Sequence, residues 1–198
     1  FQSNFSFDEK TARDYDLKNA IGKAAAALVR DGDIIALNSS TITTLMARHL
    51  TAKNLTLVTN SLNILNIAKD FPGHQIVVLG GIYMHKAQTI EGPTTTEQIN
   101  QLHFDKVFFG ANGVDVQFGF SSASELEAQS KVSMLAHTQR SYCLCEHSKF
   151  NRTSLFKIAA LDEVDGLVTD WKTEDDVVKR YSQYLDVIIA QQYNGNRG

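Results

Sequence analysis

Short apolar runs alternate with segments of helical spacing along almost the whole chain. The apolar runs cover residues 34–37, 55–59, 76–79, 107–110, 141–145, 167–169 and 187–190. Apolar residues at helical spacing predict helices over 16–29, 42–50, 62–70, 95–102, 125–136 and 174–184. Strands that are apolar throughout are buried on both faces, and the intervening helices supply the cover. We therefore expect an α/β, Rossmann-like fold with a mostly parallel open sheet of about six to seven strands and helices on both faces.

Capping signals support several of the predicted helices. Ser61 precedes the helix at 62–70 as an N-cap. The stretches "TTTE" (94–97) and "TEDD" (173–176) are typical of capping boxes. Gly32, within "RDGD", is expected to stop the first helix.

The chain of 198 residues is long enough for one domain with a full core. It contains no linker rich in Pro, Gly or Ser, no repeat and no low-complexity tract. The first four residues, "FQSN", are typical of what remains of a cleaved affinity tag. We therefore expect a tag remnant at 1–4 and a single domain over 5–198.

Composition excludes some classes of protein. The net charge of −3 argues against a nucleic-acid-binding surface over the whole domain. No apolar run approaches the ~20 residues that span a bilayer, and no signal peptide is recognisable. The two cysteines, Cys143 and Cys145, are too close together to suit a disulfide, so we expect reduced thiols and a cytoplasmic protein.

Small polar residues follow most of the predicted strands. In an open α/β sheet these positions gather along one rim, where ligands bind. The stretches are "NSST" (38–41), "TNS" (59–61), "GG" (80–81), "GANG" (110–113), "EHSKF" (146–150) and "TDW" (169–171). The connection from Gly80 to Pro93 is the longest, which marks it as a candidate functional segment.

This rim suits the binding of an anion. A helix N-terminus offers unpaired N–H groups and a partial positive charge. The hydroxyls of Ser39, Ser40, Thr41 and Thr43 add donors, and Lys149 supplies a full charge. The alternative is that these hydroxyls only cap their own helix.

Other polar residues carry weaker signals. Glu125 and Glu127 suit acid–base chemistry, or they complement the dipole of their own helix. Lys131, on the same helix, is surface unless it faces the rim. The six histidines lack the spacing of a metal site, and the chain has neither a P-loop nor a G-x-S-x-G elbow.

Taken in order, these stretches resemble the effector-binding domain of the DeoR family of bacterial transcriptional regulators. The resemblance covers almost the whole chain from 17 onward. It is carried by "LKNAIGKAAAALVRDGD", "GDIIALNSSTITT", "LTLVTNSLNI", "VVLGGIY", "DKVFFGANGVD", "HSKF" and "VDGLVTD".

The resemblance implies a fold related to sugar-phosphate isomerases and glucosamine-phosphate deaminases. It implies a repressor domain that senses a phosphorylated sugar, needs no cofactor, and forms a homodimer or homotetramer. A winged helix-turn-helix that binds operator DNA precedes this domain in the family, and we expect it to be absent from this sequence. The implied effector site consists of Asn38, Ser39, Ser40, Thr41, Thr43, Asn60, Gly80, Gly81, Asn112, Gly113, Lys131 and Lys149.

The sequence departs from the family pattern within the phosphate loop. Asn38 replaces an Asp, Ser40 a Gly and Ile42 a Thr, and Glu146 replaces the Asp of D-x-S-K. The second function considered is a sugar-phosphate isomerase or deaminase. The related isomerases have acidic residues where this chain has Asn112 and Gly113, and an amide cannot take a proton at neutral pH. We therefore expect no enzyme, with Asp115 as the nearest candidate for residual activity.

Overall fold

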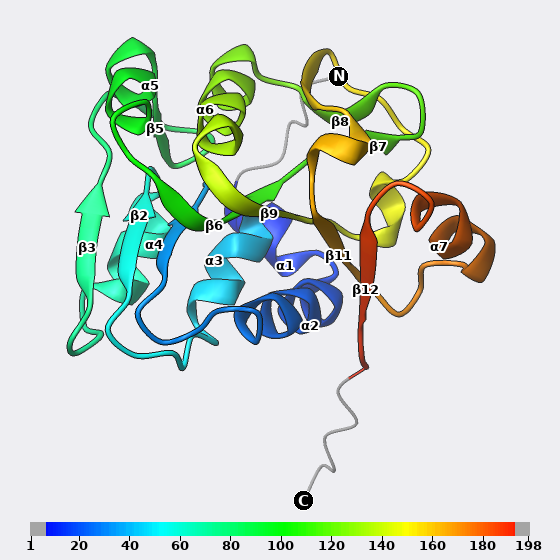
Figure 1. Cartoon of the computed structure of the whole chain (residues 1–198), viewed down its shortest axis with the longest axis horizontal. Coiled ribbons are helices and arrows are strands. Elements are labelled where there is room, and N and C mark those ends of the chain that lie inside the picture. Colours follow the sequence, from blue (N-terminus) through cyan, green and yellow to red (C-terminus); the bar gives the residue numbers. More distant parts are fainter. Residues whose placement is uncertain (1–6, 193–198) are drawn as a thin grey trace, which may run out of the picture.

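A computed structural model describes residues 7–192 (Figure 1). The expected tag remnant at 1–4 lies outside them. Seven strands form the main sheet, in the order β12-β11-β9-β6-β1-β2-β3, and every neighbouring pair in it is parallel. They are β1 (Ile34–Leu37), β2 (Thr56–Thr59), β3 (Gln75–Val78), β6 (Phe104–Gly110), β9 (Thr138–Leu144), β11 (Gly166–Asp170) and β12 (Asp186–Ala190). Each of these strands overlaps a predicted apolar run, so the expected α/β class is confirmed.

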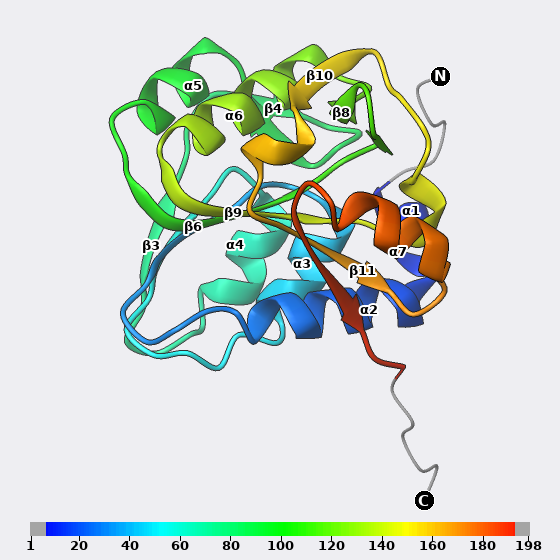
Figure 2. The same cartoon turned by 45° about the vertical axis from the view of Figure 1, so that its right-hand side comes forward.

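Helices cover both faces of this sheet (Figures 1 and 2). One face packs against α2 (Tyr15–Ala26), α3 (Thr41–Ala47) and α4 (Leu62–Ala68), with the short α1 (Phe7–Ala12) beside α2 and α3. The other face packs against α5 (Pro93–Ile99), α6 (Glu125–Ala136) and α7 (Asp175–Tyr181).

Alternate side chains of one strand enter the two different cores. Ile35 and Leu37 of β1 join the cluster under α2, α3 and α4, whereas Ala36 between them joins the opposite cluster. Phe108 and Phe109 of β6 divide in the same way. Because both faces are buried, the sequence shows continuous apolar runs instead of alternation.

Two small antiparallel sheets were not predicted. One is the hairpin of β4 (Ile82–Met84) and β5 (Thr89–Glu91). The other joins β7 (Gly113–Asp115), β8 (Gly119–Ser122) and β10 (Phe156–Ala159). Two 3-10 turns, η1 (His147–Lys149) and η2 (Leu161–Glu163), complete the described elements. The first hairpin lies within the long connection that the sequence singled out.

The capping predictions were right at one helix and wrong at two. Ser61 caps α4, because its hydroxyl accepts a hydrogen bond from the Ile64 N–H at 3.4 Å. Neither α5 nor α7 has a side-chain cap. The N-cap of α5 is Gly92 and Pro93 opens the helix, as a residue without an N–H can, so "TTTE" lies inside it. The first helix predicted from the sequence corresponds to α2, which ends at Ala26, before Gly32.

The chain changes direction across the sheet between β1 and β6. After β1 it moves through β2 to the β3 edge, and then it returns to place β6 on the other side of β1. The helix after β1 and the helices around β6 cover opposite faces, so the connections diverge beyond the carboxyl ends of these two strands. Such a switch point opens a crevice in α/β sheets.

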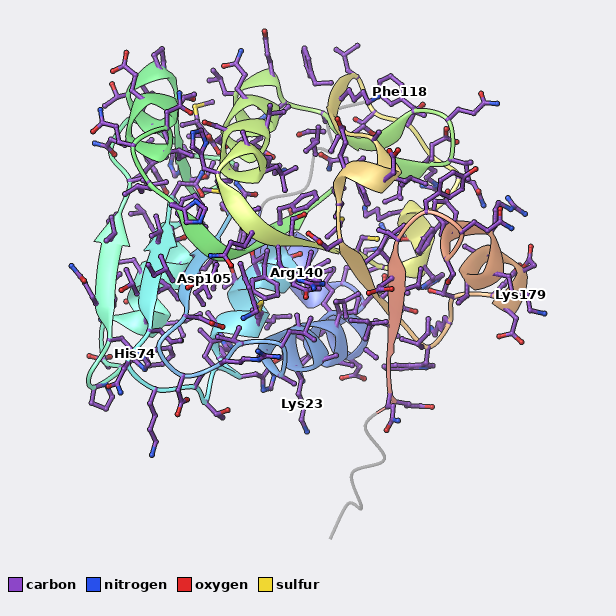
Figure 3. The ribbon with its side chains drawn as sticks, viewed as in Figure 1. Lys23, His74, Asp105, Phe118, Arg140 and Lys179 are labelled. Atoms are coloured by element: carbon purple, nitrogen blue, oxygen red, sulfur yellow. The ribbon has the colours of Figure 1, made fainter. Side chains whose placement is uncertain are left out.

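Hydrogen bonds at the opposite end of the sheet connect β6 to its neighbours. Asp105, labelled in Figure 3, accepts from the Ile34 N–H at 2.8 Å and from Gln139 Nε2 at 3.1 Å. Lys106 pairs with Asp33 at 2.5 Å.

Cys143 and Cys145 are both free and buried. Within residues 7–192, no helix has the length and apolar character needed to cross a membrane.

Candidate functional site

A cavity of about 670 Å³ lies at the carboxyl end of β1, β6 and β9. Its walls come from the loops after these strands, the region of α1 and the start of α2, α6, and the turn of the β4–β5 hairpin. Six of the residues that the sequence predicted line it: Ser39, Ser40, Thr41, Asn112, Lys131 and Lys149.

Ser40 and Thr43 cap helix α3 reciprocally. The Thr43 N–H donates to Ser40 Oγ at 3.1 Å, and the Ser40 N–H donates to Thr43 Oγ1 at 3.0 Å. The Thr43 hydroxyl also donates to the Asn38 carbonyl at 2.6 Å. These two hydroxyls therefore serve local structure, as the capping alternative expected.

Ser39 and Thr41 differ from that pair. Neither hydroxyl takes part in a hydrogen bond among the described residues, and both side chains are partly exposed at the cavity. Thr41 is the first residue of α3, where backbone N–H groups point out of the helix. The donors that remain for a ligand thus come from Ser39, Thr41 and the helix N-terminus.

Gly110 makes room for the loop that follows β1. A Cβ at this position would lie 2.8 Å from the Ser40 Cβ and 3.0 Å from its Oγ. A real Cβ contact is never that short, so only glycine lets the end of β6 pass beneath Ser40. The Ser40 side chain is thus accommodated by the glycine opposite it.

Asn60 positions the loop from behind instead of lining the cavity. Its Oδ1 accepts from the Ser39 N–H at 3.1 Å, and its Nδ2 donates to Glu91 Oε1 at 2.9 Å and to the Ile90 carbonyl at 3.1 Å. Glu91 is fully buried, and burial raises its pKa to about 7, with the charge of Glu127 adding to the rise. Its Oε2 has no hydrogen-bond partner in the described part of the chain.

Asn38 is also fully buried behind the loop. Neither its Oδ1 nor its Nδ2 finds a partner within residues 7–192. Unpaired buried amides are rare because each costs about 1–3 kcal/mol.

Two lysines of the cavity are neutralised within the protein. Lys131 of α6, expected at the surface unless it faced the rim, lines the cavity and is buried, and its Nζ lies 3.6 Å from Glu127 Oε2. Lys18 of α2 is buried too, and its Nζ lies 3.3 Å from Glu146 Oε1. Lys18 also donates to the Arg13 carbonyl.

Other cations at the cavity have no carboxylate partner among the described residues. They are Lys86, Lys149, Arg152 and Lys172. With Arg13, which lies 3.7 Å from Asp14, seven Lys and Arg side chains line the cavity, against four Asp and Glu. The chain as a whole carries −3, so positive charge is concentrated here.

The remaining predicted residues lie away from the cavity surface. Gly80 and Gly81 contact α5: the Gly80 N–H donates to Gln98 Oε1 at 2.7 Å, and its carbonyl accepts from Thr95 Oγ1 at 2.7 Å. Gly113 starts β7, where a Cβ would lie 2.4 Å from the Arg152 carbonyl oxygen. These glycines shape the neighbouring elements instead of facing a ligand.

Several lining residues were missed by the sequence reading: Lys18, Lys86, Glu146, His147, Arg152 and Lys172. His147, Glu146 and Lys172 stand within the rim stretches or next to them, but nothing in the sequence distinguished them from surface residues. Lys86 reaches the cavity because the long connection after β3 folds into a hairpin with its turn there.

The carboxylate proposed for residual enzyme activity lies elsewhere. Asp115 closes the turn between β7 and β8, accepting from the Gln117 and Phe118 N–H groups at 2.9 Å each, and it does not line the cavity. No group of three or more His, Cys, Asp or Glu side chains in the described ranges could hold a metal ion.

The fold is similar to two solved structures. Ribose-5-phosphate isomerase in complex with phospho-erythronic acid matches with a TM-score of 0.51 and 14% identity, over 69% of this chain and 54% of that one. The delta subunit of eIF2B from Chaetomium thermophilum matches with a TM-score of 0.56 and 15% identity, over 79% and 56%. The fold is thus that of the sugar-phosphate isomerase class.

The family model of the DeoR C-terminal sensor domain matches residues 13–171. This chain belongs to that family. It is 35% identical to the HTH-type transcriptional repressor GlcR of Bacillus subtilis, over 77% of this chain and 59% of the relative. It is 30% identical to the lactose phosphotransferase system repressor of Staphylococcus epidermidis, over 92% and 73%. The chain therefore spans about three fifths of GlcR.

Proposed function

We propose that this domain senses a phosphorylated sugar and thereby controls operator binding by a transcriptional repressor. The chain belongs to the DeoR sensor-domain family, and two of its relatives, GlcR and the lactose phosphotransferase system repressor, are named as repressors. Operator DNA is contacted by a helix-turn-helix domain of the whole protein, in the cytoplasm. The sensor domain pairs with further copies, so that two DNA-binding domains reach both half-sites.

The observation that carries this proposal is the charge of the cavity. Seven cationic and four anionic side chains line the cavity, in a chain whose net charge is −3. Four of the cations have no carboxylate partner within the described residues. A cavity with surplus positive charge binds an anionic ligand better than a neutral one.

In this proposal the phosphate is held by the loop after β1. Ser39 and Thr41 donate their hydroxyls, the start of α3 donates N–H groups, and Lys149 supplies charge. Asn112 and Lys131 complete the ligand contacts. Asn38, Ser40, Thr43, Asn60, Gly80, Gly81 and Gly113 act from behind, by fixing the loops.

We assign no catalysis to the site. An isomerase needs a general base in reach of the sugar carbons. Of the carboxylates considered for that role, Asp115 is held in a turn away from the cavity, and Glu127 is paired with Lys131. Incubation with ribose 5-phosphate or glucosamine 6-phosphate is expected to return them unchanged, and turnover at ~1 per second or faster would support the enzyme instead.

Calorimetry with matched ligands tests the proposal. Sugar phosphates and the same sugars without phosphate are titrated into the protein, after a thermal-shift screen has selected the sugar. A ligand at ~100 times its dissociation constant adds ~2.7 kcal/mol to the free energy of unfolding, which such a screen detects easily. Equal affinities for the two members of each pair would refute a phosphate site.

A further inference from the structure

His147 and Asp170 form a fixed pair at one end of the cavity. The His147 Nδ1 and the Asp170 Oδ1 lie 2.9 Å apart, within hydrogen-bond distance. Asp170, at the end of β11, is fully buried, whereas the His147 side chain is about one third exposed and lines the cavity. The pair therefore joins the buried sheet to the ligand space.

Backbone hydrogen bonds hold both partners in place. The Asp170 carboxylate accepts from the His147 N–H at 2.8 Å and from the Lys172 N–H at 3.0 Å. A carboxylate with several N–H donors remains an acceptor, so Nδ1 of His147 carries the proton. Nε2 lies on the side of the ring away from Asp170 and is the nitrogen left to bond a ligand.

The position of His147 along the rim places it beyond a bound phosphate. His147 follows β9, and the Ser39–Thr41 loop follows β1, with β6 between them. Two strand spacings correspond to about 10 Å. A ligand anchored by its phosphate at the α3 N-terminus thus extends past Asn112 towards His147.

We propose that His147 is a specificity residue that accepts a hydrogen bond from a hydroxyl of the bound effector, and that Asp170 positions it. An acceptor nitrogen matches a hydroxyl donor. It does not match a phosphate dianion, which has only acceptors to offer. The phosphate loop thus recognises charge, while His147 recognises the sugar. This inference rests on the proposed sensing of a phosphorylated sugar.

Two variants of His147 and two probes test the assignment. The probes are inorganic phosphate and the tightest-binding sugar phosphate of the screen, both titrated by calorimetry. His147→Leu is expected to lower the affinity for the sugar phosphate roughly five- to tenfold, as for one lost hydrogen bond. The affinity for inorganic phosphate is expected to fall by no more than about twofold. His147→Gln, whose amide oxygen can accept a hydrogen bond, is expected to recover most of the affinity.

The outcomes separate this inference from the proposed function. Sugar phosphate affinity that is unchanged in His147→Leu overturns the inference and leaves phosphate sensing standing. Equal losses for both probes also overturn it, because they indicate a general effect on the cavity. A wild-type protein that binds inorganic phosphate but no sugar phosphate overturns the sugar-sensing function, and the inference with it.

The role of Asp170 is tested by NMR of the ligand-free protein and by titration of a variant. Nitrogen-15 NMR of the wild-type imidazole is expected to show the proton on Nδ1. In Asp170→Asn the proton is expected to distribute to Nε2, and the sugar phosphate affinity to fall as in His147→Leu. A wild-type ring protonated mainly at Nε2 would overturn the assignment, even if Asp170→Asn fails to fold.

Discussion

Ser40 lies directly against Gly110, and a Cβ at position 110 would come within 2.8 Å of the Ser40 Cβ. Gly110→Ala is therefore expected to displace the capping residue of α3. Overpacking of this kind costs about 1–3 kcal/mol of unfolding free energy, and the displaced loop should bind effector less tightly. Denaturant unfolding and calorimetry measure the two effects.

Gly80→Ala is the matched control for that substitution. Gly80 also follows a strand of the main sheet, but its added Cβ would meet only the movable end of the Gln98 side chain, at 3.3 Å. Effector affinity close to wild type is expected there. If Gly80→Ala and Gly110→Ala lower the effector affinity equally, the contact with Ser40 is not the cause of the lowered affinity.

Thr41 and Ser40 are expected to respond differently to loss of the hydroxyl. Thr41→Ala should lower the affinity for a phosphorylated effector about tenfold to a hundredfold, because a donor to a charged acceptor contributes ~1.5–3 kcal/mol. Its melting temperature should stay close to wild type, since the Thr41 hydroxyl has no partner within the described residues. Ser40→Ala should instead lose ~1 kcal/mol of stability through the lost cap. The reverse pattern would assign the capping role to Thr41.

Glu91 predicts a pH-dependent stability. The carboxyl titrates near 4.5 when unfolded and at about 7 in the fold. Between these pH values the folded chain holds a proton that the unfolded chain has released, so stability falls as pH rises from about 4.5 to 7 and then levels off. The change is on the order of 3 kcal/mol.

Glu91→Gln isolates that contribution. The amide cannot ionise, and its oxygen can still accept from Asn60. The difference in unfolding free energy between the variant and wild type is expected to grow with pH up to about 7, with the variant more stable at pH 8. A difference that is constant from pH 5 to pH 8 would show that Glu91 does not titrate in this range.

Lys149→Met should lower the affinity for a phosphorylated effector at least tenfold, because a full charge at the cavity is lost. The affinity should also depend less on salt concentration. Lys179→Met is the control, since Lys179 is exposed on α7 (Figure 3) and does not line the cavity. Titrations at low and high salt compare the two variants. A loss of affinity in both would point to net charge instead of a contact.

Much of the fold could be predicted from the sequence because each main-sheet strand is buried on both faces. A short apolar run such as 34–37 is typical of a strand that is buried on both faces. The predicted bounds of α6, 125–136, match the structure, where the Ser124 hydroxyl accepts from the Glu127 N–H at its start. The boundaries of α2 and α5 were less accurate, because the packing of neighbouring elements and Pro93 set them.

The small sheets could not be predicted by the same reasoning. The strand β8 reads "GFSS", which is typical of a loop, yet all four residues are buried between β7 and β10. β4 is short, and its Ile82 and Tyr83 are exposed, so no apolar face marked it. These strands depend on partners elsewhere in the chain more than on their own pattern.

The candidate site was predictable only in part for a similar reason. The hydroxyls and Lys149 could be predicted because they directly follow strands. Lys18 could not, because its partner Glu146 lies at the other end of the sequence and only the fold brings them within 3.3 Å. His147 and Asp170 likewise meet only because β9 and β11 are neighbours.

Helix α1 supplies part of the cavity wall through Phe7 and Glu9, so the ligand space and the start of the domain share a surface. A ligand that favours one position of α1 must, by thermodynamic reciprocity, be bound more tightly when α1 is held in that position by something else. The factor is the same in both directions. If the proposed function is right, the ratio of effector affinities in the free and the operator-bound protein equals the ratio of operator affinities without and with effector.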